Sequence, residues 1–123
     1  MLSKTIVVVD DEADIRELLY YNLTREGYVV KSFDNPLHSI QYLENHDPDV
    51  ILSDWLMPDM DGLEFCKQLK ENKKFREIPF IFITCKSDEN DIVKAFEFGA
   101  DDYIIKPFRI KELVARINKL INK

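Results

Sequence analysis

The chain has 123 residues, a formal net charge of −6, three glycines and two cysteines. That length fits a single domain whose core is large enough to fold without disulfide or metal cross-links. The acidic balance argues against direct binding of nucleic acid or of an anionic membrane, and three widely separated glycines exclude a glycine-rich phosphate loop. The two cysteines, Cys66 and Cys85, are too few for a disulfide framework or a zinc site.

Five short apolar runs predict strands, and the first of them covers residues 5–9. This run is continuous rather than alternating, which is typical of a strand buried on both faces of a parallel sheet. Asp10 ends it well short of a secretory signal or a membrane helix, so we expect a cytoplasmic protein that binds no membrane. The other predicted strands cover residues 28–33, 50–53, 79–83 and 103–105.

Apolar residues at every third or fourth position, the spacing of a helix face, follow each predicted strand. In the first helix Ile15, Leu18, Leu19 and Leu23 recur at helical spacing, and Gly27 favours the turn that ends it. Asn35 and Pro36 are typical of the N-cap and the first residue of the second helix. The apolar faces of the last four helices contain Leu37, Ile40 and Leu43, then Leu63, Phe65, Cys66 and Leu69, then Ile92, Val93 and Phe96, and finally Leu113, Val114, Ile117, Leu120 and Ile121.

The strict alternation of five strands with five helices predicts a parallel sheet covered by helices on both faces, an α/β fold of three layers. No internal repeat or linker interrupts the pattern, so one domain should span residues 1–123. In open sheets of this kind, ligands bind beyond the carboxyl ends of the strands. The residues that follow each strand are therefore the candidates for a functional site.

Polar side chains follow four of the five predicted strands: Asp10 and Asp11 the first, Asp54 the third, Thr84 the fourth and Lys106 the fifth. Three carboxylates, a hydroxyl and an ammonium should thus meet at one edge of the sheet. Oxygen ligands without His or Cys suit a hard cation such as Mg²⁺. A metal and a lysine leave room for a phosphoryl group, and one carboxylate could be its nucleophile.

The motifs at this edge resemble those of the receiver domain of bacterial two-component response regulators. The matching segments are VVDDE at residues 8–12, SDWLMPDMDG at 53–62, IT at 83–84, GADDY at 99–103 and KPF at 106–108. Their order and spacing fit over essentially the whole chain. The resemblance implies a flavodoxin-like (βα)5 fold with strand order 2-1-3-4-5, and a phospho-acceptor domain rather than a turnover enzyme.

The resemblance also implies a role for each residue of the acidic edge. Asp54 would be the phospho-acceptor, and it would receive its phosphoryl group from a sensor histidine kinase or a phosphotransfer protein. Mg²⁺ or Mn²⁺ would be bound by Asp11, by Asp54 and by the backbone carbonyl of Leu56, with Asp10 acting through a water molecule. From the residues alone, the acidic run could also cap the helix that follows it.

Lys106 and Thr84 would stabilise the phosphoryl group, and Thr84 would form a switch pair with Tyr103, as the resemblance implies. Tyr103 would swing inward when Thr84 moves toward the phosphoryl group. From the residues alone, Tyr103 could equally be a half-buried strand aromatic without a switching role. The peptide bond between Lys106 and Pro107 is cis in the family. An apolar Leu56 cannot orient a water molecule, so we expect slow autodephosphorylation.

The last third of the chain mixes charges of both signs, at Lys94, Asp101, Asp102, Glu112 and Arg116. The segment KELVARI at residues 111–117 resembles receivers attached to winged-helix DNA-binding domains, where this face forms a homodimer on phosphorylation. The resemblance implies control of transcription through an attached output domain that this chain lacks. The alternatives are an exposed face of weak ion pairs, and a stand-alone regulator that acts by direct protein contact.

Two other protein classes share part of this pattern. A phosphatase of the haloacid dehalogenase type also uses an Asp nucleophile with Mg²⁺, but it needs a second Asp where this chain has Leu56. A flavodoxin shares the fold class, but its first loop is rich in Ser, Thr and Gly, where this chain has Asp10, Asp11 and Glu12. Both classes fit less well than a receiver domain.

Overall fold

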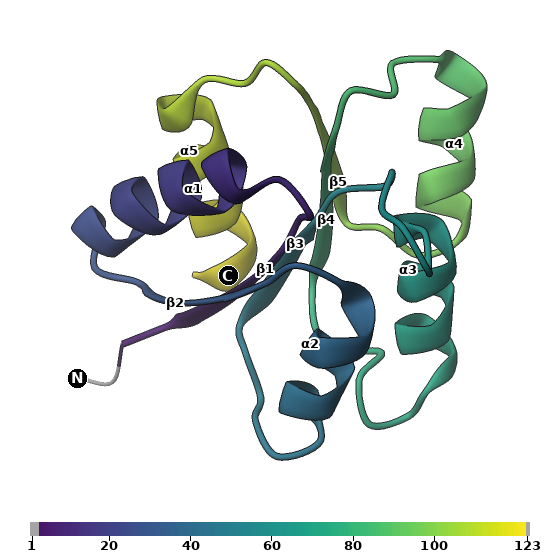
Figure 1. Ribbon diagram of the computed structural model, residues 1–123, viewed down its shortest axis with the longest axis horizontal. Coiled ribbons are helices and arrows are strands. Elements are labelled where there is room, and N and C mark those ends of the chain that lie inside the picture. Colours follow the sequence, from purple (N-terminus) through teal and green to yellow (C-terminus); the bar gives the residue numbers. More distant parts are fainter. Residues whose placement is uncertain (1–2, 123) are drawn as a thin grey trace.

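Five parallel strands form one central sheet in the computed structural model, which describes residues 3–122 (Figure 1). Their spatial order is 2-1-3-4-5, as predicted. The strands are β1 (Thr5–Val9), β2 (Val29–Phe33), β3 (Val50–Ser53), β4 (Phe80–Thr84) and β5 (Asp102–Ile105).

Helices cover both faces of the sheet, so the predicted three-layer α/β/α architecture is confirmed. The helices are α1 (Ala13–Arg25), α2 (Pro36–Leu43), α3 (Gly62–Glu71), α4 (Glu89–Glu97) and α5 (Ile110–Ile121). Figure 1 shows α1 and α5 together on one face, with α2, α3 and α4 on the other. No helix among residues 3–122 is long and apolar enough to cross a membrane.

Successive residues of the central strands alternate between two hydrophobic cores. In β1, Ile6 and Val8 belong to the core beneath α1 and α5, whereas Val7 and Val9 belong to the core beneath α2, α3 and α4. All four side chains are buried. The continuous apolar run in the sequence therefore reflects a strand that is covered on both sides.

Local signals in the sequence mark where the helices begin and end. The side chain of Asn35 accepts a hydrogen bond from the backbone N–H of His38, which makes it the N-cap predicted for α2. After α1, Gly27 has a φ of 96°, and the N–H of Tyr28 donates to the carbonyl of Leu23. Because Tyr28 takes part in this helix-ending turn, β2 begins one residue later than predicted.

The fourth strand is shifted by one residue from the predicted range of 79–83. Pro79 has no N–H to donate, and it lies just outside β4, although its carbonyl accepts a hydrogen bond from Ile51 of β3. At the other end, Thr84 is the last residue of β4 and pairs with Ile105 of β5. Because of this shift, Thr84 belongs to β4 at the carboxyl edge of the sheet, and its strand pairing fixes the position of its backbone.

Candidate functional site

Asp54 follows β3 directly and is buried at the carboxyl edge of the sheet. Its backbone N–H donates to the carbonyl of Val9 at 3.0 Å, so the pairing of β1 with β3 extends up to this residue. Oδ1 of Asp54 accepts hydrogen bonds from the backbone N–H groups of Trp55, at 2.6 Å, and Leu56, at 3.4 Å. These contacts fix the carboxylate from one side and leave Oδ2 for a side chain.

Lys106 joins the acidic residues of this edge. Its Nζ lies 3.0 Å from Oδ2 of Asp54, 3.0 Å from Oδ2 of Asp10 and 3.1 Å from Oε1 of Glu12. An ammonium group has three N–H donors, so each donor has one carboxylate partner. The peptide bond between Lys106 and Pro107 is cis.

The buried charges of Asp10 and Lys106 alter each other's protonation. Burial raises the pKa of Asp10 above its ordinary value, although hydrogen bonds from the Glu12 N–H and from Lys106 act in the opposite direction. Burial by itself lowers the pKa of Lys106, but the hydrogen bonds and charges of Asp10 and Asp54 outweigh it and raise that pKa overall. Lys106 is therefore an ammonium ion throughout the physiological pH range.

Asp10 is fixed by its neighbours on every side. Its N–H donates to the carbonyl of Phe33 at 3.1 Å, and its Oδ1 accepts from the N–H of Glu12 at 2.9 Å. The guanidinium of Arg16 donates to the backbone carbonyl of Asp10 at 2.7 Å. The loop between β1 and α1 is thus held by side-chain contacts as well as by the sheet.

The carboxylates of this edge have the chemistry and spacing of a site for a small hard cation. Oxygens from Asp10, Glu12 and Asp54 all lie within 4.8 Å of one another. Mg²⁺ binds oxygen at about 2.0–2.1 Å, so two ligands on opposite sides of one ion are about 4.2 Å apart. Asp11 and Leu56 are exposed at the same edge, and Asp11 lies outside this group of three. Their predicted roles as direct ligands stay predictions.

Glu12 is the site residue that the sequence reasoning missed. The available signal was its position as the third acid of the run Asp10 to Glu12, a run that also fits helix capping. In the structure Glu12 occupies the N-cap position of α1, but its side chain makes no capping hydrogen bond. Its carboxylate instead forms an ion pair with the ammonium group of Lys106.

Thr84 and Tyr103 both contact the loop that follows β4. Thr84 is fully buried, and its Oγ1 accepts a hydrogen bond from the N–H of Lys86 at 3.3 Å. The hydroxyl of Tyr103 donates to the carbonyl of Lys86 at 2.7 Å, and burial raises the pKa of this phenol to about 12. Tyr103 is thus already turned inward and buried in the structure, rather than half-buried. The expected inward swing therefore has no outward starting position here, and the switching role of Tyr103 stays a prediction.

Trp55 lies beneath the same loop and is buried in the core. Its ring centroid is 5.3 Å from that of Phe82 and 6.5 Å from that of Tyr103. The Nζ of Lys86 stands 4.9 Å from the centre of the Trp55 ring, within the range of a cation–π contact. The indole therefore connects Asp54, its neighbour in the chain, to the loop that holds Tyr103.

Four of the five charged residues of the predicted dimer face pair within the chain. Nη1 of Arg116 lies 3.0 Å from each carboxylate oxygen of Asp102, and its Nη2 lies 3.4 Å from Glu112. Asp101 accepts from the backbone N–H of Phe80 and lies 3.3 Å from the Nζ of Lys70. Lys94 is exposed on α4. Pairing within one chain does not test a dimer, which stays a prediction.

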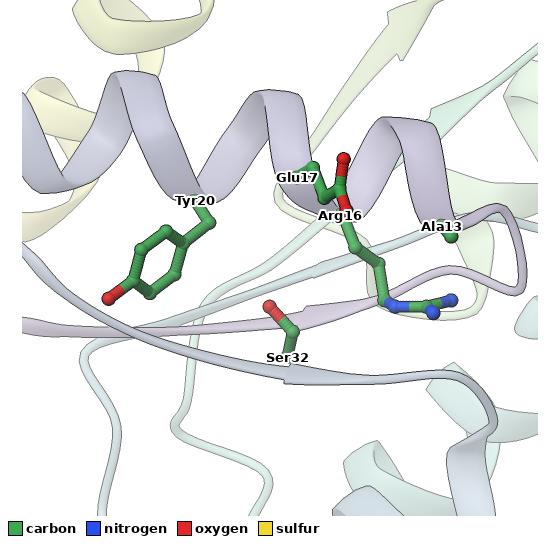
Figure 2. A pocket seen from close by; sticks show the side chains of 5 residues that line it. All are labelled: Ala13, Arg16, Glu17, Tyr20 and Ser32. Atoms are coloured by element: carbon green, nitrogen blue, oxygen red, sulfur yellow. The ribbon is translucent and has the colours of Figure 1, made fainter.

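Two cavities lie beside the acidic edge. The first, of about 280 Å³, lies between α1 and β2 (Figure 2) and is lined by Ala13, Arg16, Glu17, Tyr20 and Ser32. None of these residues belongs to the predicted site, although Arg16 reaches the carbonyl of Asp10. The second, of about 370 Å³, opens at Lys106 and is otherwise lined by Ile15, Leu18, Cys85, Pro107 and Phe108.

Comparison with known sequences gives a consistent result. A family model described as the response regulator receiver domain matches residues 6–118. The chain is 39% identical over its whole length to the phosphate regulon transcriptional regulatory protein PhoB of Pseudomonas aeruginosa, of which it covers 54%. It is 40% identical over 99% of its length to the alkaline phosphatase synthesis transcriptional regulatory protein PhoP of Bacillus subtilis, of which it covers 50%. The chain spans about half the length of these curated relatives.

Solved structures with the same fold include two receiver domains. The signal receiver domain of a signal transduction histidine kinase from Syntrophus aciditrophicus is 36% identical, with a TM-score of 0.90 over 98% of this chain and 91% of that one. The BeF3-activated DrrB receiver domain is 31% identical, with a TM-score of 0.89 over 99% of this chain and 100% of that one.

Proposed function

This chain belongs to the response regulator receiver domain family, and we propose on that basis that it accepts a phosphoryl group on Asp54 in a Mg²⁺-dependent transfer. The observation that carries the proposal is the environment of the Asp54 carboxylate, which is held by backbone N–H groups on one oxygen and by Lys106 on the other. Those contacts orient a nucleophilic carboxylate toward the open edge of the sheet.

The proposed transfer moves one phosphoryl group between two side chains. A carboxylate oxygen of Asp54 forms a bond to phosphorus while the bond from phosphorus to the imidazole nitrogen of a phosphohistidine breaks. The nitrogen keeps the electron pair and takes a proton from water. Lys106, held beside Asp54 by its buried neighbours, would neutralise the phosphoryl oxygens as they approach.

Mg²⁺ or Mn²⁺ is the proposed cofactor, and it would supply positive charge to balance the carboxylates and the phosphoryl group. Asp11, Asp54 and the backbone carbonyl of Leu56 would bind the ion directly, and Asp10 would act through a water molecule. The nearness of Asp10 and Asp54, two of the three acids whose carboxylate oxygens lie within 4.8 Å of one another, supports a cation site of this kind. Both carboxylate oxygens of Asp10 already accept hydrogen bonds, from the Glu12 N–H and from Lys106, which suits an indirect role.

A sensor histidine kinase or a phosphotransfer protein is the proposed donor. Such a protein must bring its phosphohistidine to an acceptor that is almost fully buried, so it has to dock beside the carboxyl edge. The largely apolar cavity at Lys106, with Leu18 and Phe108 among its lining residues, is a surface that this donor could cover.

Phosphorylation would be read through Thr84 and Tyr103. Thr84 would move to bond the phosphoryl group, and the loop that binds the Tyr103 hydroxyl through Lys86 would move with it. The change would reach the face formed by α4, β5 and α5. We propose that this face then forms a homodimer that controls an attached DNA-binding output domain, through Lys94, Asp101, Asp102, Glu112 and Arg116.

A stand-alone regulator that acts by direct protein contact is the second candidate. The observation that favours it is that Arg116 is already paired with Asp102 and Glu112 within one chain, so a dimer would have to exchange these partners. Dimerisation on phosphorylation, measured by size-exclusion chromatography, would favour the transcription regulator. A phosphorylated monomer would favour the stand-alone regulator.

The phosphorylated state is expected to hydrolyse slowly, because water must be oriented for attack on the acyl phosphate. Leu56 is exposed two residues beyond Asp54 and has no polar atom in its side chain to orient such a water. Decay of the phosphoryl adduct at neutral pH measures this, and a half-life below about one minute would contradict it.

The decisive test is incubation with acetyl phosphate and Mg²⁺, followed by intact mass measurement. The wild type should gain about 80 Da, and Asp54→Asn should gain nothing. Asp59→Asn is the matched control, because Asp59 is an exposed acid in the same loop and Asn tolerates its φ of 71°. An adduct that survives in Asp54→Asn would contradict the proposed function.

A further inference from the structure

The three carboxylates around Lys106 differ sharply in their exposure to solvent. The side chains of Asp10 and Asp54 are 3% and 7% exposed, and that of Lys106 is 8% exposed. The side chain of Glu12 is 59% exposed, yet its Oε1 lies only 3.1 Å from Nζ. Glu12 therefore reaches in from the solvent side to complete the contacts of a buried ammonium.

Lys106 has no N–H donor left for a phosphoryl group. The ammonium has three donors, and each is directed at a different carboxylate. A phosphoryl oxygen can bond Lys106 only if one of these contacts opens. The contact that opens is the one whose carboxylate loses the least stabilising free energy when it is separated from the ammonium.

Release of either buried carboxylate would be unfavourable. Asp54 loses its charge only when its bond to phosphorus forms. While the phosphoryl group approaches, Asp10 and Asp54 are both still carboxylates and would remain desolvated after losing the ammonium, which is strongly destabilising for a buried charge. Glu12 would instead regain water, since most of its side chain is already in solvent. The contact between Glu12 and Lys106 is thus the one that opens at least cost.

The local backbone leaves the Glu12 side chain free to move. Glu12 occupies the N-cap position of α1, but its carboxylate makes no capping hydrogen bond there. Its backbone N–H is the group that bonds Oδ1 of Asp10. Outward rotation of the side chain would therefore leave both the helix start and the Asp10 contact in place.

We propose that Glu12 is a positioning residue that holds Lys106 in the unphosphorylated protein and is displaced by the incoming phosphoryl group. This role rests on the proposed phosphorylation of Asp54 and deepens it. Glu12 competes with the phosphoryl donor for one N–H of Lys106, so it raises the donor concentration needed for phosphorylation. It acts through Lys106 and contributes no atom to the transfer itself.

The test compares the acetyl phosphate concentration that gives half-maximal adduct formation at saturating Mg²⁺. Glu12→Gln weakens the contact by removing the charge, and Glu12→Asp keeps the charge on a side chain one methylene shorter. Both should lower the half-maximal concentration by about two- to fivefold, the range expected from losing one partly exposed ion pair. Glu17→Gln is the matched control, because Glu17 is an exposed acid on α1 (Figure 2), and it should behave as the wild type.

Two further measurements separate this role from others. In a Lys106→Met background, Glu12→Gln should not change the acetyl phosphate concentration that gives half-maximal adduct formation, because the ammonium that Glu12 contacts has been removed. The Mg²⁺ affinity, followed by Trp55 fluorescence, should change by less than about threefold in Glu12→Gln, whereas loss of a metal ligand would weaken it at least about tenfold.

The proposed role of Glu12 is wrong if Glu12→Gln needs as much acetyl phosphate as the wild type, or more. It is also wrong if Mg²⁺ affinity falls about tenfold, because Glu12 would then be a ligand of the ion. A wild type that forms no adduct contradicts the proposed function together with this role. A wild type that forms the adduct while the Glu12 variants do not differ from it contradicts the role of Glu12 alone.

Discussion

Gly62 packs directly against the backbone of Asp54, so closely that a Cβ at Gly62 would lie 2.1 Å from the Asp54 carbonyl oxygen. The same Cβ would lie 2.7 Å from the Cα of Trp55. The N–H of Gly62 donates to the carbonyl of Trp55 at 2.7 Å, which fixes the start of α3 against the loop after β3. The position of the acceptor thus depends on the absence of a side chain at Gly62.

Gly62→Ala should therefore destabilise the protein and slow phosphorylation. The added methyl group meets backbone atoms that cannot rotate away, and overpacking of this kind costs about 1–3 kcal/mol of unfolding free energy. Urea unfolding and the rate of adduct formation measure the two effects. Gly27→Ala is the control: its Cβ would meet nothing within 4 Å, but its φ of 96° is strained for alanine. Gly27→Ala should lower the unfolding free energy by about 1–2 kcal/mol and leave the rate of adduct formation unchanged. Equal rates for the wild type, Gly62→Ala and Gly27→Ala would contradict the prediction for Gly62.

Asp10→Asn should stabilise the protein at pH 7 in the absence of divalent cations. Burial raises the pKa of Asp10 in the folded protein, so folding favours the protonated carboxyl, and the unfolding free energy falls as pH rises through that range. Asn removes this penalty and can still accept a hydrogen bond from Lys106 or from the Glu12 N–H.

The gain should disappear when the pH falls below the ordinary carboxyl pKa of 3.8, because Asp10 is then uncharged in both states. Urea unfolding at several pH values in EDTA measures the difference. Asp47→Asn, a change at an exposed loop acid, should show no such gain. A difference between Asp10→Asn and the wild type that does not depend on pH would contradict the electrostatic cause.

Only one of the two thiols should react quickly with a thiol reagent in the folded protein. Cys66 is fully buried in the core, and burial raises its pKa to about 12, whereas Cys85 is exposed. Since the thiolate is the reactive form, one rapid equivalent should be titrated in buffer and two in denaturant. Cys85→Ser should remove the rapid equivalent and Cys66→Ser should retain it. Two rapid thiols in the folded wild type would contradict the burial of Cys66.

Trp55 is the only tryptophan of the chain, and its fluorescence should report on the metal and on the phosphoryl group. The indole adjoins Asp54 and lies under the ammonium of Lys86, so a change of charge at the edge alters its surroundings. Mg²⁺ should change the emission in a saturable way, and beryllofluoride should change it further.

The same signal tests Asp11 as a metal ligand. Asp11→Asn should raise the Mg²⁺ concentration for half-maximal change by about tenfold or more, and Asp14→Asn, at an exposed acid in the first turn of α1, should leave it unchanged. If Asp11→Asn titrates as the wild type does, Asp11 is not a ligand. No response to Mg²⁺ with beryllofluoride would contradict the geometry proposed for the whole edge.

The elements and the central site residues could be predicted because they depend on local patterns and on one rule of topology. The carboxyl ends of parallel strands meet at one edge, so Asp10, Asp54 and Lys106 had to converge there wherever the helices lay. The strand order was expected only from the resemblance to a known family. Hydrophobic spacing does not distinguish one order of buried parallel strands from another.

Contacts that depend on the direction of a side chain could not be predicted. The reach of Glu12 to Lys106 depends on how the start of α1 is oriented over the sheet edge. The burial of Trp55 and the inward position of Tyr103 depend on the path of the loop after β4, whose backbone carbonyl at Lys86 binds the phenol. A sequence pattern assigns residues to a strand or a loop, but it does not give these paths.

The ion pair between Lys106 and Asp54 joins residues that are 52 positions apart, and the lysine directly follows the last strand of the sheet. A ribosome synthesising this chain therefore makes the acceptor well before its cation. Until β5 has been translated and has docked on β4, the nascent chain holds carboxylates with no ammonium to pair them. The capacity to carry a signal should arise late in biosynthesis and in one step, when the final strand joins the sheet.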